Sequence, residues 1–156
     1  MIGEYAATVA ACDTLDRVGE AFRVALAREG YNSSTSRAWL NGGDRPRTQS
    51  YFRNWTKEWA KLSDEKELAK KSPVIAEARR RITPFTWREA QEQHTFSAAE
   101  REVISVAAEF GYFNGLVVPV HGPRGYFATV GIGSSEGSRF QRRAAPEIVD
   151  DLAPHA

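Results

Sequence analysis

Four side chains in the middle of the sequence recur at helical spacing and have the composition of a ligand-binding surface. Tyr51, Trp55, Trp59 and Leu62 follow one another at intervals of three or four residues, which predicts a helix that begins near Ser50. Tyrosine and tryptophan bring polar hydrogens along with large apolar rings, and a buried polar hydrogen needs an acceptor. Two interpretations follow. The rings fill the core, as aromatic stripes at this spacing usually do, or they wall a cavity for a small amphiphile.

The sequence gives weaker support to a metal site, a catalytic site or a dinucleotide-binding site. His94, His121 and His155 lie far apart, and Cys12 is remote from all three, so the sequence has no metal-ligand spacing. No Gly-x-Ser-x-Gly motif is present, and we expect neither catalytic residues, nor a metal, nor a cofactor. The glycines within residues 131–137 follow a predicted strand but lack the dinucleotide-binding spacing, which favours a flexible strand exit.

Length and charge set the class of protein. The 156 residues suit a single domain spanning 1–156. A formal charge of +1 provides no basic excess for binding nucleic acid, and the apolar segments are too short to cross a membrane. One cysteine cannot form an internal disulfide, so nothing points to an oxidising compartment. These features predict a cytoplasmic domain that acts without membrane or direct DNA contact.

The first half of the chain predicts a helix, a strand and a charged connection. Thr14 is placed to cap a helix that Gly30 ends, and residues 31–40 read as a half-buried strand. Residues 41–46 form a loop. After the aromatic helix, residues 61–71 are charged and aperiodic, which indicates a solvated connection.

The second half predicts helices followed by a hairpin. Ser72 and Pro73 are typical of a helix start, and residues 84–87 read as a turn. Ser97 begins a capping box for the next helix. Two strands, 116–120 and 126–132, are joined by a hairpin, and a weak last helix covers 147–152. This order predicts an α/β fold, a three-layer α/β/α sandwich of the GAF/PAS kind with a central antiparallel sheet.

Several motifs in the same order and spacing resemble the autoinducer-binding domain of LuxR-type quorum-sensing regulators. The likeness runs from about Ala21 to Gly133. The motifs that carry it are Tyr51-x-x-x-Trp55-x-x-x-Trp59, Ser72-Pro73-Val74, Pro84-Phe85-Thr86-Trp87, Ala107-Ala108-Glu109-Phe110-Gly111 and Gly115-x-x-x-Pro119.

The resemblance implies a ligand and a set of residues that hold it. Such domains enclose an N-acyl-homoserine lactone between the sheet and one helical layer. By position, Trp55 would donate its indole N–H to the lactone carbonyl, Tyr51 its hydroxyl to the amide carbonyl, and Trp87 would pack on the lactone ring. Three apolar residues would help line the cavity: Val74, Val103 and Ile104.

Three departures from the family pattern concern ligand recognition. Ser72 stands where the family usually has an Asp that accepts the ligand amide, a change that weakens binding roughly tenfold if only the charge is lost. Trp59 replaces the usual Tyr and narrows the pocket. Gly131 stands at a strand position that often carries a hydroxyl, and Thr129 lies on the same strand face as a substitute.

The resemblance also implies partners. In LuxR-type regulators the ligand stabilises the fold and the dimer, and a helix-turn-helix, which is not found in this sequence, binds DNA. We therefore expect a non-enzymatic sensing domain for an acyl-homoserine lactone or a related amphiphile, forming a homodimer or a heterodimer. The alternative is a truncated interaction protein that heterodimerises with a full-length regulator and inhibits it without needing ligand.

Overall fold

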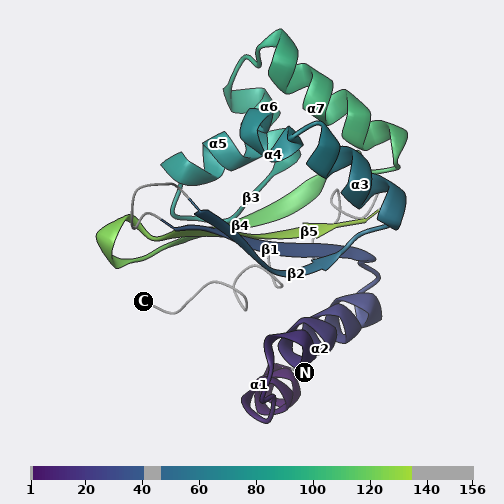
Figure 1. The fold of residues 1–156 in the computed structure, drawn as a ribbon, viewed down its shortest axis with the longest axis vertical. Coiled ribbons are helices and arrows are strands. Elements are labelled where there is room, and N and C mark those ends of the chain that lie inside the picture. Colours follow the sequence, from purple (N-terminus) through teal and green to yellow (C-terminus); the bar gives the residue numbers. More distant parts are fainter. Residues whose placement is uncertain (1, 41–46, 135–156) are drawn as a thin grey trace.

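The computed structural model describes residues 2–40 and 47–134, which form three layers around one antiparallel sheet (Figure 1). The spatial order of the strands is β2-β1-β5-β4-β3. Their bounds are Ser33–Leu40 (β1), Arg47–Asn54 (β2), Phe85–Thr86 (β3), Gly115–His121 (β4) and Phe127–Gly133 (β5). Helices cover both faces of the sheet, so the predicted α/β/α sandwich is confirmed.

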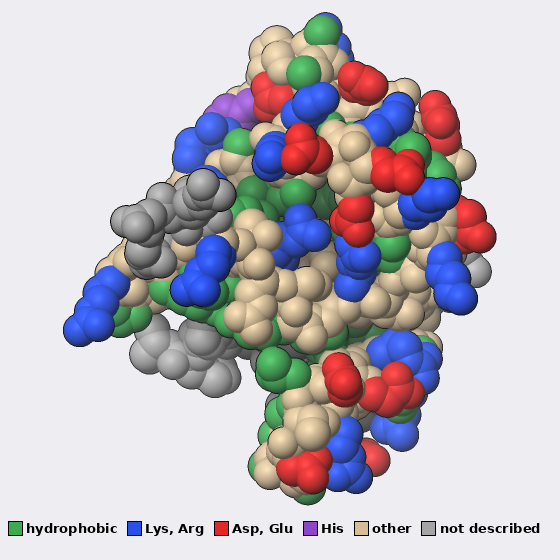
Figure 2. All heavy atoms as spheres, in the orientation of Figure 1, with side chains coloured by type: hydrophobic (Ala, Val, Ile, Leu, Met, Phe, Trp, Pro, Cys, Tyr) green, Lys and Arg blue, Asp and Glu red, His purple; other side chains and the backbone are tan. Residues whose placement is uncertain are grey.

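The two helical layers differ in size (Figure 1). One consists of α1 and α2, and the other of α3 to α7. The helix bounds are Ile2–Ala10 (α1), Leu15–Arg28 (α2), Lys57–Glu65 (α3), Leu68–Lys71 (α4), Pro73–Arg80 (α5), Trp87–Gln93 (α6) and Ala98–Glu109 (α7). Acidic and basic side chains are mixed over the outer surface of the α3–α7 layer (Figure 2), in keeping with the small net charge of the sequence.

Local signals fix several helix ends as the sequence predicts. The Thr14 hydroxyl accepts a hydrogen bond from the Arg17 amide at the start of α2. Ser97 forms the capping box of α7 with Glu100. Gly30 and Gly111 follow α2 and α7 with φ angles of 84° and 88°, a left-handed conformation that glycine adopts without a Cβ penalty. The β4–β5 hairpin is also confirmed, with a short 3-10 turn at Pro123–Gly125.

The predicted helix from Ser50 is wrong, because that segment pairs with β1. β2 runs antiparallel to β1 from Arg47, opposite Leu40, to Asn54, opposite Ser34. A helix begins only after Thr56, whose hydroxyl accepts from the Trp59 amide. The spacing of three and four that suggested one helix therefore spans a strand, a turn and a helix.

Two further interpretations are corrected. Residues 61–71 are the end of α3 and the whole of α4, with the Ser63 and Leu68 side chains buried, so the segment is not a solvated connection. Residues 84–87 are not a plain turn, because Phe85 and Thr86 pair with β4 and Thr86 then forms the capping box of α6 with Glu89. In both segments tertiary packing adds order that charge and turn composition do not reveal.

The smaller layer closes one face of the sheet with an apolar core. This α2 core comprises Phe22, Leu26, Tyr31, Leu116 and Ile132, each at most 5% exposed. Close approach of α2 to β2 depends on Gly19, since a Cβ there would lie 2.8 Å from the Cβ of Phe52. None of the helices within residues 2–40 and 47–134 has the length and apolar character of a membrane span. The predicted loop at 41–46, the helix at 147–152 and the end of the glycine segment at 135–137 lie outside the described residues.

Candidate functional site

Six of the nine predicted ligand-binding residues gather in two adjoining hydrophobic clusters under the α3–α7 layer. The α5–α6 cluster contains Val74, Ala78, Phe85, Ala90, Val117 and Phe127, with Ile104 packed against it. The α3–α7 cluster contains Trp59, Leu68, Val103, Val106 and Ala107, with Trp55 packed against it. Trp87 packs against both clusters and so joins them. The structure thus brings together Trp55, Trp59, Val74, Trp87, Val103 and Ile104 from four different helices and the turn before α3.

Trp59 and Trp55 have different surroundings. The Trp59 side chain is 6% exposed, and its ring centroid lies 5.2 Å from Phe110 and 5.9 Å from Tyr112. Trp55 is only partly buried; its ring lies 5.7 Å from that of Trp59, and the guanidinium of Arg53 lies 5.3 Å from its centroid. Trp59 therefore contributes to core packing, whereas Trp55 stands at the margin of the cluster.

Trp87 is held in place from two sides. It is the first residue of α6, and the Asn114 side chain accepts from the amides of Arg88 at 3.2 Å and Gly115 at 3.0 Å, which fixes the start of α6 to the start of β4. The indole approaches Gly115 closely, since an added Cβ there would be 2.8 Å from the indole nitrogen. This position requires glycine because of close approach to a ring.

Ser72 is the N-cap of α5, as its sequence context predicts. Its hydroxyl accepts from the Ile75 amide at 3.4 Å, and Pro73 is the first helical residue. An N-cap hydroxyl that accepts through its oxygen still carries a hydrogen to donate. Ser72 thus has a structural role that does not depend on a ligand.

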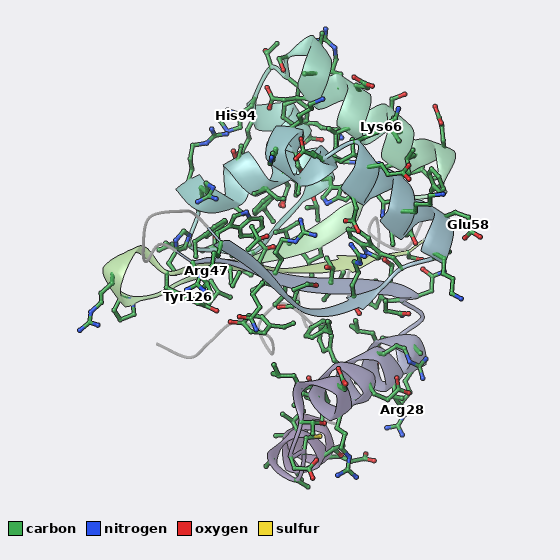
Figure 3. All side chains as sticks on the ribbon, in the orientation of Figure 1. Arg28, Arg47, Glu58, Lys66, His94 and Tyr126 are labelled. Carbon is green, nitrogen blue, oxygen red and sulfur yellow. The ribbon has the colours of Figure 1, made fainter. Side chains whose placement is uncertain are left out.

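Tyr51 belongs to neither of the two clusters and lies on β2. The register of β1 and β2 shifts between Ser36 and Arg37, which leaves Tyr51 as the unpaired residue of a bulge. Its hydroxyl lies 3.3 Å from that of Tyr126, and this hydrogen bond, with burial as a second cause, raises the pKa of Tyr126. In Figure 3, Tyr126 lies toward the opposite end of the sheet from Glu58 on α3.

Thr129 lies on the floor of the site, on the sheet face that the α3–α7 layer covers. It is 6% exposed and is paired with Pro119 on β4 and Arg37 on β1. Phe127, two residues earlier on the same strand face, belongs to the α5–α6 cluster. Gly131 follows two residues later, and a Cβ there would meet only the methyl group of Thr35, at 3.1 Å.

Sequence reasoning missed the charged groups at the margin of the site. Arg53 donates to both carboxylate oxygens of Asp64, at 2.9 and 3.1 Å. The hydrogen bond from Arg53, opposed in part by burial, lowers the pKa of Asp64. Arg37 shares the strand face of Thr129, and the strand period of two in residues 33–40 would have placed it beside Trp39 and Thr35.

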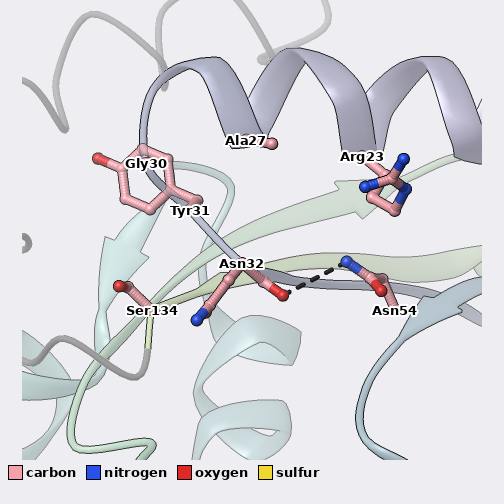
Figure 4. Close-up of a pocket in the computed structure, with 7 residues that line it drawn as sticks. All are labelled: Arg23, Ala27, Gly30, Tyr31, Asn32, Asn54 and Ser134. Atoms are coloured by element: carbon pink, nitrogen blue, oxygen red, sulfur yellow. Dashed lines mark hydrogen bonds between the residues drawn. The ribbon is translucent and has the colours of Figure 1, made fainter.

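A separate cavity of about 510 Å³ lies away from the two clusters, by the carboxyl end of α2 (Figure 4). Its wall is largely polar and includes none of the predicted residues: it is lined by Arg23, Ala27, Gly30, Tyr31, Asn32, Asn54 and Ser134. The Asn54 amide donates to the Asn32 carbonyl across it at 3.3 Å. We do not assign the ligand to this cavity, because an amphiphile needs a mainly apolar wall. In the part of the chain that the structure describes, no three His, Cys, Asp or Glu side chains are grouped to hold a metal ion.

The fold is an α/β sandwich with aromatic side chains clustered on one face of the sheet, and comparison with known sequences identifies its family. The chain belongs to the autoinducer binding domain family, whose sequence profile matches residues 14–156. The predicted resemblance to the autoinducer-binding domain of LuxR-type regulators is confirmed.

Curated relatives and solved structures agree with this family. The transcriptional activator BjaR1 of Bradyrhizobium diazoefficiens is 27% identical over 113 residues, which cover 72% of this chain and 47% of BjaR1. The activator TraR of Rhizobium radiobacter is 29% identical over 75 residues, 48% of this chain and 32% of TraR. The matched region therefore spans half or less of each of these relatives.

Two solved proteins share the fold at low sequence identity. The N-acylhomoserine lactone dependent LuxR family factor CepR2 of Burkholderia cenocepacia has a TM-score of 0.74 at 17% identity, covering 99% of this chain and 92% of that one. SdiA of Escherichia coli has a TM-score of 0.78 at 10% identity, covering 97% of this chain and 63% of SdiA. A structure of SdiA in complex with octanoyl-rac-glycerol has a TM-score of 0.69 at 11% identity, covering 97% of this chain and 61% of that one.

Proposed function

We propose that this domain senses a small amphiphile, an N-acyl-homoserine lactone or a related signal, bound between the sheet and the α3–α7 layer. The observation that supports this most is the position of Trp87 between two hydrophobic clusters that contain or contact six predicted binding residues. In this proposal the domain acts in the cytoplasm by binding and not by catalysis. The family and the lactone-dependent CepR2 with the same fold support the ligand class.

The proposed contacts follow the polar groups that remain available. Trp55 donates its indole N–H to the lactone carbonyl from the margin of the α3–α7 cluster, and Trp87 packs on the lactone ring. Ser72 donates its hydroxyl hydrogen while its oxygen caps α5, and Thr129 contacts the acyl chain from the sheet. Tyr51 reaches the ligand amide only by leaving Tyr126 or by accepting from it while donating to the ligand.

Ligand binding would act on the regulator through stability. A ligand that binds only the folded state adds about 2.7 kcal/mol to the free energy of unfolding at 100 times its dissociation constant. That increment is a large share of the stability of a small domain. The ligand-bound domain then persists as a homodimer or as a heterodimer with a LuxR-type relative, and DNA is bound through the helix-turn-helix of a LuxR-type regulator.

The experiment is a ligand titration of the melting temperature. We expect N-acyl-homoserine lactones, tested with chain lengths from four to twelve carbons, to raise the Tm, and Trp55→Phe to lose most of that rise because phenylalanine lacks the indole N–H. Tyr5→Phe is the control, since it also removes one polar hydrogen from an aromatic side chain but lies in the opposite helical layer, with its ring 6.3 Å from that of Phe22. Equal shifts in the parent and in Trp55→Phe would contradict the role of Trp55.

The alternative function would give a different result in the same samples. The packing of Trp59 against Trp55, Phe110 and Tyr112 shows that part of the aromatic surface fills the interior. If no ligand raises the Tm and the ligand-free chain forms mixed dimers with a full-length LuxR-type regulator in size-exclusion chromatography, the chain is an interaction protein and the sensing proposal is wrong.

A further inference from the structure

Arg37 is a cation on the floor of the proposed site. On β1 it lies opposite Thr129 of β5, and the next pair on the same face is Trp39 and Phe127. Phe127 packs into the α5–α6 cluster. Because side chains two apart on a strand share a face, Arg37 lies on the face that the α3–α7 layer covers. It is partly buried.

The neighbouring charges do not neutralise Arg37. Asp64 on α3 accepts hydrogen bonds from Arg53 at both of its oxygens. The guanidinium of Arg37 makes no hydrogen bond or ion pair with any residue in the ranges that the structure describes. Arg37, Arg53 and Asp64 therefore leave an excess of one positive charge beside predicted binding residues that are all uncharged, and the guanidinium of Arg79, 4.5 Å from the Phe127 ring centroid, adds a second cation on the same face.

Partial burial makes this position unfavourable for a charged side chain. Burial lowers the pKa of Arg37, Asp64 opposes that shift and the charge of Arg53 adds to it. An arginine keeps its charge at neutral pH in spite of such a shift. A partly desolvated cation that has no hydrogen-bonded or ion-paired partner among residues 2–40 and 47–134 is a group that an anionic ligand stabilises.

The molecular surface is hollowed near the sheet (Figure 2). Figure 2 shows the molecule hollowed between the α3–α7 layer and the strands, with hydrophobic side chains in the depth and positively charged side chains beside them. We propose that Arg37 is the specificity-determining residue of this site and pairs with a carboxylate of the ligand. The inference rests on the proposed function and, of the ligands that it covers, selects an acidic relative in place of the neutral lactone.

The test compares two probes that differ in one charge. Octanoate and methyl octanoate have the same acyl chain, and their affinities for the full chain at pH 7 are measured from the tryptophan fluorescence and from the Tm. We expect the wild type to bind octanoate about tenfold more tightly or better, as a charge-assisted pair implies. Arg37→Met, which keeps an unbranched apolar side chain, is expected to lose the preference, and Arg37→Lys to keep part of it.

Controls separate pairing from general attraction and from folding. Arg17→Met removes the same charge from α2, in the opposite layer, where Arg17 is exposed and paired with Asp13, and is expected to keep the full preference for octanoate. If Arg37→Met does not fold, Arg37→Gln replaces it in the comparison of octanoate with methyl octanoate. The wild type gives a second comparison, because octanoate loses its charge below its own pKa and should then bind no more tightly than the ester.

Each result decides between the two proposals. Equal affinity of the wild type for octanoate and its methyl ester overturns the role of Arg37, and binding of N-octanoyl-homoserine lactone in that case leaves the sensing function standing. Binding of the lactone but of neither octanoyl probe likewise overturns only the inference. Failure of all three probes to bind overturns both proposals. If Arg37→Met keeps the preference for octanoate, another residue binds the carboxylate and the proposed role of Arg37 is wrong.

Discussion

The two faces of the sheet are packed in different ways. On one face, α2 seals an apolar core in which Phe22, Leu26 and Leu116 are each at most 5% exposed. On the other, tryptophan rings and apolar side chains adjoin a hydroxyl at Thr129 and a cation at Arg37. A well-packed apolar face stabilises the fold. A face that keeps polar groups near large rings contributes less stability, and those polar groups can hydrogen-bond a ligand.

The largest effect should come from the α2 core. Phe22 contacts Phe52 with a ring separation of 5.2 Å, and Phe22→Ala is expected to lower the free energy of unfolding by about 3–5 kcal/mol. Denaturant titration measures this loss. Leu15→Ala, on the same helix but 54% exposed, is expected to change stability little. If the faces are independent, the ligand-induced rise in Tm persists in Phe22→Ala; its disappearance would show that they are coupled.

Substitution of a buried carboxylate on the helical side of the site should give the next largest loss of stability. Glu77 of α5 is 3% exposed and accepts from Arg80 at 2.7 Å and from Arg81 at 2.6 Å, while the His94 ring nitrogen lies at 2.9 Å. His94 lies on the outer side of the α3–α7 layer (Figure 3). Burial alone would raise the pKa of Glu77, but the hydrogen bonds from both arginines and the charge of His94 outweigh it and lower the pKa.

Glu77→Gln is expected to cost about 1.5–3 kcal/mol of stability at pH 7. Because the folded-state pKa is lowered, the carboxylate's contribution is complete above its ordinary pKa and is lost as the pH falls through the lowered value. Wild type and variant should therefore converge in acid, as denaturation at several pH values would reveal. Glu20→Gln removes the exposed pair with Arg23 and should destabilise the protein much less than Glu77→Gln, because water screens an exposed pair. A pH-independent difference for Glu77→Gln would refute the ionic explanation.

A smaller effect should follow from moving Trp87. In Gly115→Ala the new methyl group meets the indole nitrogen at 2.8 Å and the Ile132 carbonyl oxygen at 3.2 Å, so the ring must shift, at about 1–2 kcal/mol. Tryptophan fluorescence and ligand affinity should change together. Gly3→Ala on α1, where nothing lies within 4 Å, is the control and should not lose stability. An unchanged ligand affinity in Gly115→Ala would remove Trp87 from the site.

The smallest effect separates the two roles of Ser72. Ser72→Ala should lose the α5 cap and about 1 kcal/mol, as should Ser97→Ala at the start of α7. Only Ser72→Ala should also lower the affinity for the ligand. Ser72→Asp keeps a capping oxygen and is expected to bind an acyl-homoserine lactone roughly tenfold more tightly through its charge. Equal ligand affinities of the two alanine variants would leave Ser72 with its cap alone.

Signals that act over a few residues were readable in the sequence. Thr14, Ser72 and Ser97 cap the helices that they were expected to cap, and the β4–β5 hairpin follows its turn residues. Each depends on hydrogen bonds within one helical turn or one tight turn, so neighbours in sequence suffice. Ligand contact by the nine predicted residues stays a prediction, although the clustering of six agrees with it.

The errors fall where distant segments decide the outcome. Tyr51 belongs to a strand because its neighbours Ser50 and Phe52 pair with β1, and no local pattern distinguishes that strand from the expected helix. The Arg53–Asp64 pair likewise joins two elements that only the chain reversal before α3 brings together.

The sequence by itself determined the order of most elements, the caps and the family, since these depend on local hydrogen bonding and on motifs in fixed order. Tertiary structure alone decided which rings are core and which stand at the margin, and it placed Arg37 beside Thr129. The physical reason is that burial and unpaired charge are properties of the surroundings of a side chain, and strand pairing and helix packing create those surroundings across long separations in sequence.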